Sequence, residues 1–241
     1  MEFDFLVILF FISALYASVG HGGASGYLAL MAFYSFSLEI MRPSALVLNL
    51  FVAGISFIQF YRTGYFKLRL LLPFILSSVP MSFLGGMITL DPTWYKRILG
   101  VLLIAAILRL AGVIGNMPRE TKPPQFIVGL MIGGIIGFFS GVIGIGGGII
   151  LSPMILLLGW DNVKETAAVS AAFIWINSLA GLFGMVTVGN FMIDDIWSYV
   201  LIAVAGGAIG AYLGSFKSNL RGLRLTLSFV LIIASFKLIF F

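Results

Sequence analysis

The stretch Gly144-Ile145-Gly146-Gly147-Gly148 interrupts an apolar segment that runs from Phe126 to Leu158. A second glycine-rich stretch, Gly20-His21-Gly22-Gly23-Ala24-Ser25-Gly26, interrupts the apolar segment from Phe3 to Phe36 in the same way. Glycine is a poor helix former and readily adopts a positive φ, so each stretch is expected to unwind a helix. Unwound backbone at bilayer depth is tolerated only where it is buried in protein or lines a wet cavity. Two breaks, one per half of the chain, therefore predict a transporter-type binding site, and close packing of helices through small residues is the structural alternative.

The composition predicts an integral membrane protein. Of its 241 residues, 61% are hydrophobic and 10% are charged, and the mean hydropathy is +1.13, whereas a soluble domain carries about 25% charged residues. Long apolar runs favour membrane-spanning helices over a barrel. The chain has no cysteine, one histidine and nine acidic residues, which excludes thiolate chemistry and disfavours a metal site, a cofactor or an enzyme active site. The net charge of +5 is better explained by an excess of Lys and Arg in cytoplasmic loops than by nucleic-acid binding.

Eight apolar segments can be marked along the chain. Six have about the 20 residues that a helix needs to cross a bilayer, whereas the first and fifth have 34 and 33 residues. These two are too long for one crossing and short for two, and they are the two that carry the glycine breaks. The segments are Phe3–Phe36, Ser44–Tyr61, Leu68–Leu90, Trp94–Ile114, Phe126–Leu158, Thr166–Val188, Ile196–Leu213 and Leu223–Phe241.

The two halves of the chain repeat one another at an offset of 122 to 129 residues. Four pairs of short stretches correspond in the same order, and they include the two glycine breaks themselves. This order indicates a duplicated unit of about 120 residues. We therefore expect a first transmembrane repeat at 1–115, a polar linker at 116–125 and a second transmembrane repeat at 126–241.

The basic residues indicate how the halves are oriented. If all eight segments cross the membrane once, the 14 basic residues divide seven to seven between its two sides. If segments one and five are re-entrant hairpins that turn at their glycine breaks, the division becomes ten to four. Because cytoplasmic loops are enriched in Lys and Arg, we expect six crossings, two re-entrant hairpins, inverted halves, and both termini outside.

Regularly spaced glycines within two of the segments indicate close packing of helices. Glycines recur every four residues and form ridges that let backbones approach closely: Gly129, Gly133, Gly137 and Gly141 in one segment, and Gly206, Gly210 and Gly214 in another.

Three kinds of polar side chain could contribute to a site. His21 either donates to an anion or couples protons, or else it bonds a freed carbonyl of the unwound turn. Ser25 could add a donor. Among the amides within apolar segments, Asn177 is the better site candidate, whereas Asn49 and Gln59 could serve as interhelical hydrogen bonds.

The paired breaks, the stretch from Lys164 to Val169 and the following Asn177-Ser178 resemble the TauE/SafE family, the sulfite exporter and toluene-sulfonate uptake permease family. The resemblance covers essentially the whole chain, although Ala24 stands in the first break where the second has Gly148. It implies a carrier of sulfite, thiosulfate or organosulfonates in the cytoplasmic (inner) membrane of a prokaryote. Half-helices that start at the breaks would present free amides to such an anion.

The expected substrate-binding residues therefore lie mainly in the breaks. The alternatives are a carrier of another small solute or a cation, or an accessory membrane subunit without transport of its own. The expected partners of the protein are the small anion and the lipid bilayer. The sequence does not decide whether the protein forms a homodimer or couples transport to protons or another ion. The candidate residues are Gly20, His21, Gly22, Gly23, Ser25, Gly144, Gly146, Gly147, Gly148 and Asn177.

Overall fold

The computed structural model describes residues 2–95, 97–98, 100–101, 104, 121–189 and 196–216. Within these ranges the regular secondary structure is entirely helical, as expected. Five of the helices are long and apolar enough to cross a membrane: α3, α4, α6, α8 and α9. The elements are α1 (Glu2–Ala17), α2 (Ala24–Phe33), α3 (Leu38–Arg62), α4 (Leu68–Gly86), α6 (Phe126–Ile143), α7 (Gly148–Leu157), α8 (Val163–Thr187) and α9 (Trp197–Phe216).

The first long apolar segment folds back on itself as a helical hairpin of α1 and α2. Near the turn, the hydroxyl of Tyr16 lies 2.7 Å from that of Ser25. At the open end of the hairpin, the ring of Phe5 lies 5.3 Å from the ring of Tyr34. Because early residues of α1 contact late residues of α2, the two helices run antiparallel.

The second long apolar segment forms a matching hairpin of α6 and α7. The turn lies at Gly147, where an added Cβ would touch Ile136 and Ser140 of α6. At the open end, the amide of Lys122 donates to the carbonyl of Gly159. Each returning helix, α2 or α7, has 10 residues and is therefore about 15 Å long, half the thickness of a hydrocarbon core.

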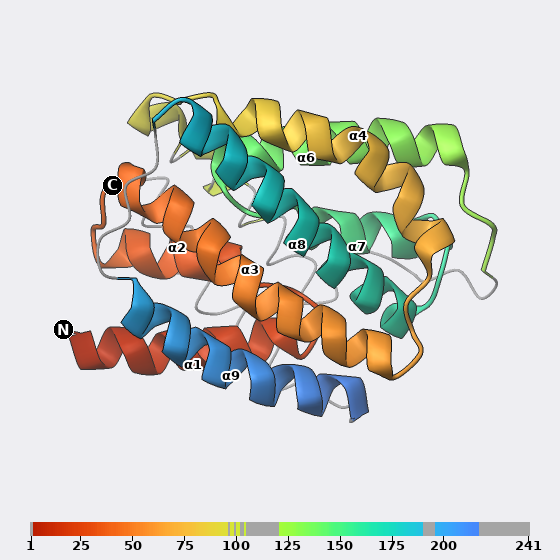
Figure 1. Cartoon of the computed structure of the whole chain (residues 1–241), viewed down its shortest axis with the longest axis horizontal. Helices are drawn as coiled ribbons and strands as arrows, with labels where there is room; N and C mark the ends of the chain where they lie inside the picture. The colour runs from red at the N-terminus through yellow and green to blue at the C-terminus, as the bar shows by residue number, and fades with distance from the viewer. Residues whose placement is uncertain are drawn as a thin grey trace.

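The two hairpins enter the bundle from opposite ends, with α3 and α8 between them (Figure 1). Both central helices have 25 residues and run antiparallel. The ion pair of Lys67 with Asp161 fixes this direction, since it joins the loop after α3 to the loop before α8. Helix α1 packs on α9, and helix α6 packs on α4. Each hairpin therefore packs against a helix from the other half of the chain.

Glycine ridges make both of these contacts. A Cβ at Gly133, Gly137 or Gly141 of α6 would collide with backbone atoms of α4. In α9, Gly206 and Gly210 meet the α1 backbone in the same way, at Phe10 and Ala14, and Gly214 meets the backbone of Ser18 just after α1. The packing role expected for both ridges is confirmed.

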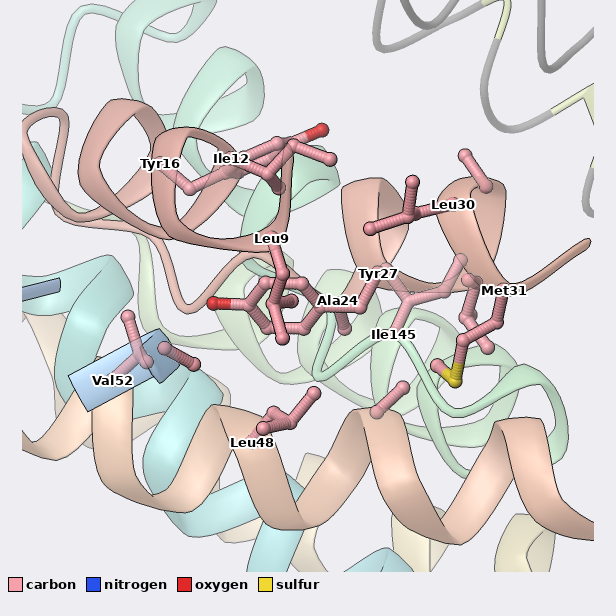
Figure 2. Close-up of a cluster of buried hydrophobic side chains, with 14 of the residues drawn as sticks. Leu9, Ile12, Tyr16, Ala24, Tyr27, Leu30, Met31, Leu48, Val52 and Ile145 are labelled. Carbon is pink, nitrogen blue, oxygen red and sulfur yellow. The ribbon is translucent and has the colours of Figure 1, made fainter. Parts of the chain in front are cut away.

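A buried apolar cluster fills the space around the first hairpin. Figure 2 shows Tyr27 of α2 in this cluster with Leu48 of α3 and with Ile145, which comes from the second break. The two breaks are thus packed into one core rather than separated by it.

The expected segments correspond to these helices in most of the chain. The first and fifth each become a hairpin, and four others become α3, α4, α8 and α9 with ends shifted by a few residues. Most of the fourth segment and all of the eighth lie outside the described residues, as do 116–120 of the expected linker; residues 121–125 are irregular.

Candidate functional site

Both glycine stretches unwind the helix, as expected. In the first break α1 ends at Ala17 and α2 starts at Ala24, and in the second α6 ends at Ile143 and α7 starts at Gly148. Five break glycines have a positive φ of 75° to 101°, a region that side-chain-bearing residues rarely adopt: Gly20, Gly23, Gly144, Gly146 and Gly147.

The side chain of Asn49 joins the two breaks. Its Oδ1 accepts a hydrogen bond from the amide of Ala24 at 3.1 Å. Its Nδ2 donates to the carbonyl of Ile145 at 3.2 Å and to Oγ of Ser178 at 3.2 Å. Asn49 is fully buried, so this one amide satisfies backbone groups of both hairpins and fixes their separation.

The breaks occupy corresponding positions on the two central helices. Asn49 is the twelfth residue of α3, and Ile174 is the twelfth residue of α8. A Cβ placed on Gly22 would touch both of these side chains, and so would a Cβ placed on Gly146. The backbone of each break therefore lies directly against the midpoints of α3 and α8.

His21 bridges from the first break to the second. Its Nδ1 lies 2.9 Å from the carbonyl oxygen of Val19 and its Nε2 lies 3.1 Å from that of Gly148. Oγ of Ser152 is also 3.1 Å from Nε2, and it lies 2.7 Å from Oγ of Ser170. Because a carbonyl only accepts, the doubly protonated imidazolium satisfies both carbonyls; the neutral ring needs the Ser152 hydroxyl to turn toward it.

Backbone amides at the start of α2 and α7 have no acceptor among the described residues. A helix leaves its first amides without intrahelical partners, and at these two ends the described side chains cap only Ala24, through Asn49. All of these residues are buried, where an unpaired amide is rare and costly. The unpaired amides belong to Gly22, Gly23, Ser25 and Gly26 at the first break and to Gly146, Gly147, Gly148 and Ile149 at the second.

Several backbone carbonyls in and next to the breaks, in contrast, accept hydrogen bonds from side chains. In the first break, the hydroxyl of Tyr27 donates to the carbonyl of Gly22 at 2.6 Å. In the turn that ends α6, the hydroxyl of Tyr95 donates to the carbonyl of Ile143 at 2.8 Å, and Nη2 of Arg42 donates to that of Gly141 at 3.3 Å. The breaks are thus rich in satisfied carbonyls and in unsatisfied amides.

The structure gathers most of the candidate residues at this centre. Gly20 lies against the backbone of Ala167 in α8, and Gly144 lies against Arg42 of α3. Asn177 is fully buried but donates to the carbonyl of Phe173 in its own helix, and its Oδ1 has no partner among the described residues. Sequence reasoning ranked Asn177 above Asn49, whereas Asn49 is the amide that hydrogen-bonds to both breaks.

Sequence reasoning also missed Arg42, Ser170 and Ile174. Arg42 lies two residues before the expected apolar segment Ser44–Tyr61, so the sequence does not mark it as a buried cation. Ile174 carries no chemical signal, because its importance comes only from its position opposite Asn49.

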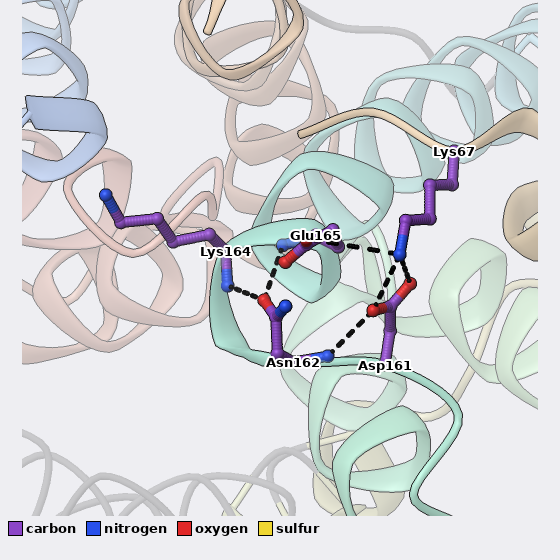
Figure 3. Close-up of polar contacts among 5 residues, drawn as sticks. All are labelled: Lys67, Asp161, Asn162, Lys164 and Glu165. Atoms are coloured by element: carbon purple, nitrogen blue, oxygen red, sulfur yellow. Dashed lines mark hydrogen bonds and ion pairs between the residues drawn. The ribbon is translucent and has the colours of Figure 1, made fainter. Parts of the chain in front are cut away.

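A second polar cluster closes the end of the bundle where α3 ends and α8 begins (Figure 3). Nζ of Lys67 lies 2.7 Å from Asp161 and 4.0 Å from Glu165. The side chain of Asn162 caps α8 by accepting from the amides of Lys164 and Glu165. No group of three His, Cys, Asp or Glu side chains that could hold a metal ion occurs in the described ranges.

These features define the class: a multi-pass helical membrane protein with two broken hairpins that meet inside the bundle. Residues 5–238 match the sulfite exporter TauE/SafE family, and the chain belongs to this family of membrane transporters. The resemblance seen in the sequence is confirmed.

Curated relatives agree with this assignment. The probable membrane transporter protein y4hK of Sinorhizobium fredii is 37% identical over 97% of both chains. The probable membrane transporter protein MJ0441 of Methanocaldococcus jannaschii is 28% identical over 78% of this chain and 76% of its own. The probable membrane transporter protein YunE of Bacillus subtilis is 24% identical over 100% of this chain and 98% of its own. No solved structure matches the chain.

Proposed function

We propose that this transporter carries sulfur-containing oxyanions, such as sulfite, thiosulfate or organosulfonates, across the cytoplasmic membrane of a prokaryote. The anion binds to the unpaired backbone amides at the starts of α2 and α7. The family description, sulfite exporter TauE/SafE, supports the substrate class.

The observation that carries this proposal is the set of buried amides at both breaks that have no acceptor among the described residues. Helix N-termini combine free donors with the positive end of the helix dipole, and both favour an anion. The amide of Ala24, which donates to Oδ1 of Asn49, is an example of how an amide at the start of α2 binds an oxygen atom. An oxyanion supplies several such oxygens at once.

We further propose that the two halves are inverted repeats. Three correspondences support this: equal central helices, hairpins that enter from opposite ends, and glycine-ridge contacts in both α1–α9 and α4–α6. Among the described residues, the end where α3 finishes carries five basic side chains, whereas the opposite end carries only Arg42 and Arg97. The five are Arg62, Lys67, Arg69, Lys122 and Lys164, so we place that end in the cytoplasm.

His21 is the candidate for proton coupling in this scheme. Its protonated ring bridges Val19, just before the first break, to Gly148 of the second, so a proton there favours contact between the hairpins. Histidine is the side chain that titrates in the physiological range.

The direct test is uptake by proteoliposomes that contain the purified full chain. We expect accumulation of labelled sulfite, thiosulfate or taurine, and none of chloride, potassium or an uncharged sugar above empty liposomes. Transport of the potassium or the sugar without the sulfur anions would support the alternative carriers. No transport and no binding of any of them would support an accessory subunit.

The binding site needs a variant that removes an amide and little else. Adding only a Cβ at Gly22 or Gly146 is not such a test, because the Cβ would displace the side chain of Asn49. Gly148 is better suited: it is the first residue of α7, where proline is tolerated, and Gly148→Pro removes its unpaired N–H.

The matched control is Gly148→Ala, which adds the Cβ and keeps the amide. Both variants are made in an Ile174→Ala background, because the end of the Ile174 side chain occupies the space beside Gly148. A hydrogen bond to a charged group contributes about 1.5–3 kcal/mol, so the proline variant should bind the anion at least about tenfold more weakly than the alanine variant. Equal affinities would place the anion elsewhere.

Sidedness is tested by reporter fusions. Fusions after Phe66 should report the cytoplasm and fusions after Asp91 the outside. The same side for both would contradict a single crossing by α4 between them.

A further inference from the structure

Arg42 is a buried cation without a counter-ion in the described part of the chain. It lies in the second turn of α3 and is 8% exposed. The nearest acid in sequence, Glu39, is exposed, and none of the described carboxylates forms an ion pair with Arg42. An unpaired charge within a membrane-spanning helix is costly and marks a functional site by default.

The guanidinium is also incompletely hydrogen-bonded. Nη2 donates to the carbonyl of Gly141 at 3.3 Å, whereas Nε is buried and has no partner among the described residues. Arginine carries five N–H donors in a planar fork that matches two oxygens of an oxyanion. The bond to Gly141 therefore anchors the side chain and leaves the Nε edge available.

Lys164 provides an instructive contrast. It occupies the matching stretch of the second half, near the start of α8. Its Nζ donates to the hydroxyl of Tyr65 at 3.2 Å and to the carbonyl of Ser215 at 3.4 Å, and it lies 4.8 Å from the centre of the Tyr65 ring. Both cations lie early in a central helix, but only Arg42 has a buried N–H donor without an acceptor in the part of the chain that the structure describes.

We infer that Arg42 is a second anion-binding residue of this transporter, which receives the sulfur oxyanion through the Nε edge of its guanidinium on the α3 N-terminal side of the breaks. Arg42 precedes Asn49 by seven residues, two helical turns or about 10 Å along α3. Its backbone contacts Gly144, the first residue of the second break. An anion on Arg42 is therefore held between the end of the bundle and the amides, in a position to be passed to them.

This inference rests on the proposed function and deepens it, because it names a side chain that selects for negative charge. The competing role is structural: Arg42 caps the last turn of α6 through Gly141 and binds nothing else. The two roles differ in what Nε does when substrate is added.

The experiment is a titration of the full chain in nanodiscs with sulfite, followed by the NMR signals of 15N-labelled arginine Nε–H groups. Arg42→Lys identifies the Arg42 signal by its loss. We expect that signal to shift with the same midpoint as sulfite binding measured by calorimetry. An Arg42 signal that stays fixed at saturating sulfite would overturn the inference, and this result does not require any variant to fold well.

Calorimetry on variants gives the second readout. Arg42→Gln should weaken sulfite binding at least about tenfold, Arg42→Lys should weaken it less because charge remains, and Lys164→Gln should leave it within about twofold. Wild-type affinity in folded Arg42→Gln protein would assign Arg42 to capping alone. If the wild-type protein bound no sulfur oxyanion, both the proposed function and the role of Arg42 would fail; binding by the wild type with a fixed Arg42 signal would remove only the latter.

Discussion

The two glycine breaks have similar backbones but very different polar surroundings. The first break is held by side chains of its own half, chiefly Tyr27 and Asn49. The second break and the turn before it are held almost entirely by the first half. Their carbonyls accept from Arg42 at Gly141, Tyr95 at Ile143 and Asn49 at Ile145, and His21 contacts Gly148.

The difference is clearest at the twelfth residue of each central helix. Asn49 caps α2 and bonds to the second break, whereas Ile174, at the same position of α8, only packs against the break glycines. The two breaks therefore have similar backbones, but the polar side chain at the twelfth position occurs in only one of the two central helices. The first half supplies the hydrogen-bonding side chains, and the second half supplies a backbone that depends on them.

The largest expected effect comes from the contact between α6, which leads into the second break, and α4. Gly137→Ala places a Cβ against the backbone of Ser78 in α4, which cannot move aside as a side chain could. We expect a loss of about 3 kcal/mol or more, seen as little folded protein after purification.

The control for this variant lies three residues earlier. A Cβ at Gly134 meets its nearest neighbour, Cβ of Ser77, at an ordinary 3.6 Å. Gly134→Ala should leave the melting temperature unchanged or raise it slightly, since alanine favours a helix by up to about 1 kcal/mol. Similar melting temperatures for the two variants would show that the ridge is not a close contact.

The next effect tests whether one side chain serves both breaks. Asn49→Ala leaves the amide of Ala24 and the carbonyl of Ile145 buried without partners. We expect a loss of about 2–4 kcal/mol in thermal unfolding together with loss of anion transport. Gln59→Ala changes an amide in the same helix away from the breaks and should transport normally; equal behaviour of the two variants would contradict the central role of Asn49.

A smaller effect follows from making the two halves more alike. Ile174→Asn gives α8 the side chain that α3 has, positioned to accept from the unpaired amide of Gly148. The new cap should compete with the anion and weaken its binding about tenfold, with little change in melting temperature. Ile174→Val keeps the site apolar and should bind as the wild type does, and unchanged affinity in Ile174→Asn would mean that this amide is not used.

The smallest effect concerns His21, the bridge between the breaks. Gln keeps one hydrogen-bonding amide but cannot titrate, so His21→Gln should retain anion binding and lose any dependence of transport on pH that His21 provides. Transport assays at a series of pH values check this. A pH profile identical to that of the wild type would assign His21 to satisfying the turn.

The hairpins could be predicted because length and glycine content are visible in the sequence. Segments of 34 and 33 residues with a central glycine run favour folding back over a single crossing, and α2 and α7 start inside these runs, at Ala24 and Gly148. The glycine ridges could be predicted for the same reason, since a spacing of four residues places them on one helix face.

The partners of the polar residues could not be predicted in this way. Asn49 and Asn177 look alike in sequence, and only the crossing of α3 and α8 decides which one reaches the breaks. Arg42 stands before the apolar segment Ser44–Tyr61 in the sequence, and nothing local shows that it is buried against Gly141. Such contacts join residues about 100 positions apart, and their geometry depends on how whole helices pack.

The glycine ridges have a mechanical consequence. Backbone in direct contact with backbone leaves no side-chain layer to slide, so α6 must move with α4, and α9 must move with α1. Each of these rigid units combines helices from both halves of the sequence. We therefore expect rocking between an inward-open and an outward-open state to occur between these mixed units, at the α3–α8 crossing, and not between the two halves. Spin labels on α1 and α9 should keep a constant separation during transport, whereas labels on α1 and α6 should not.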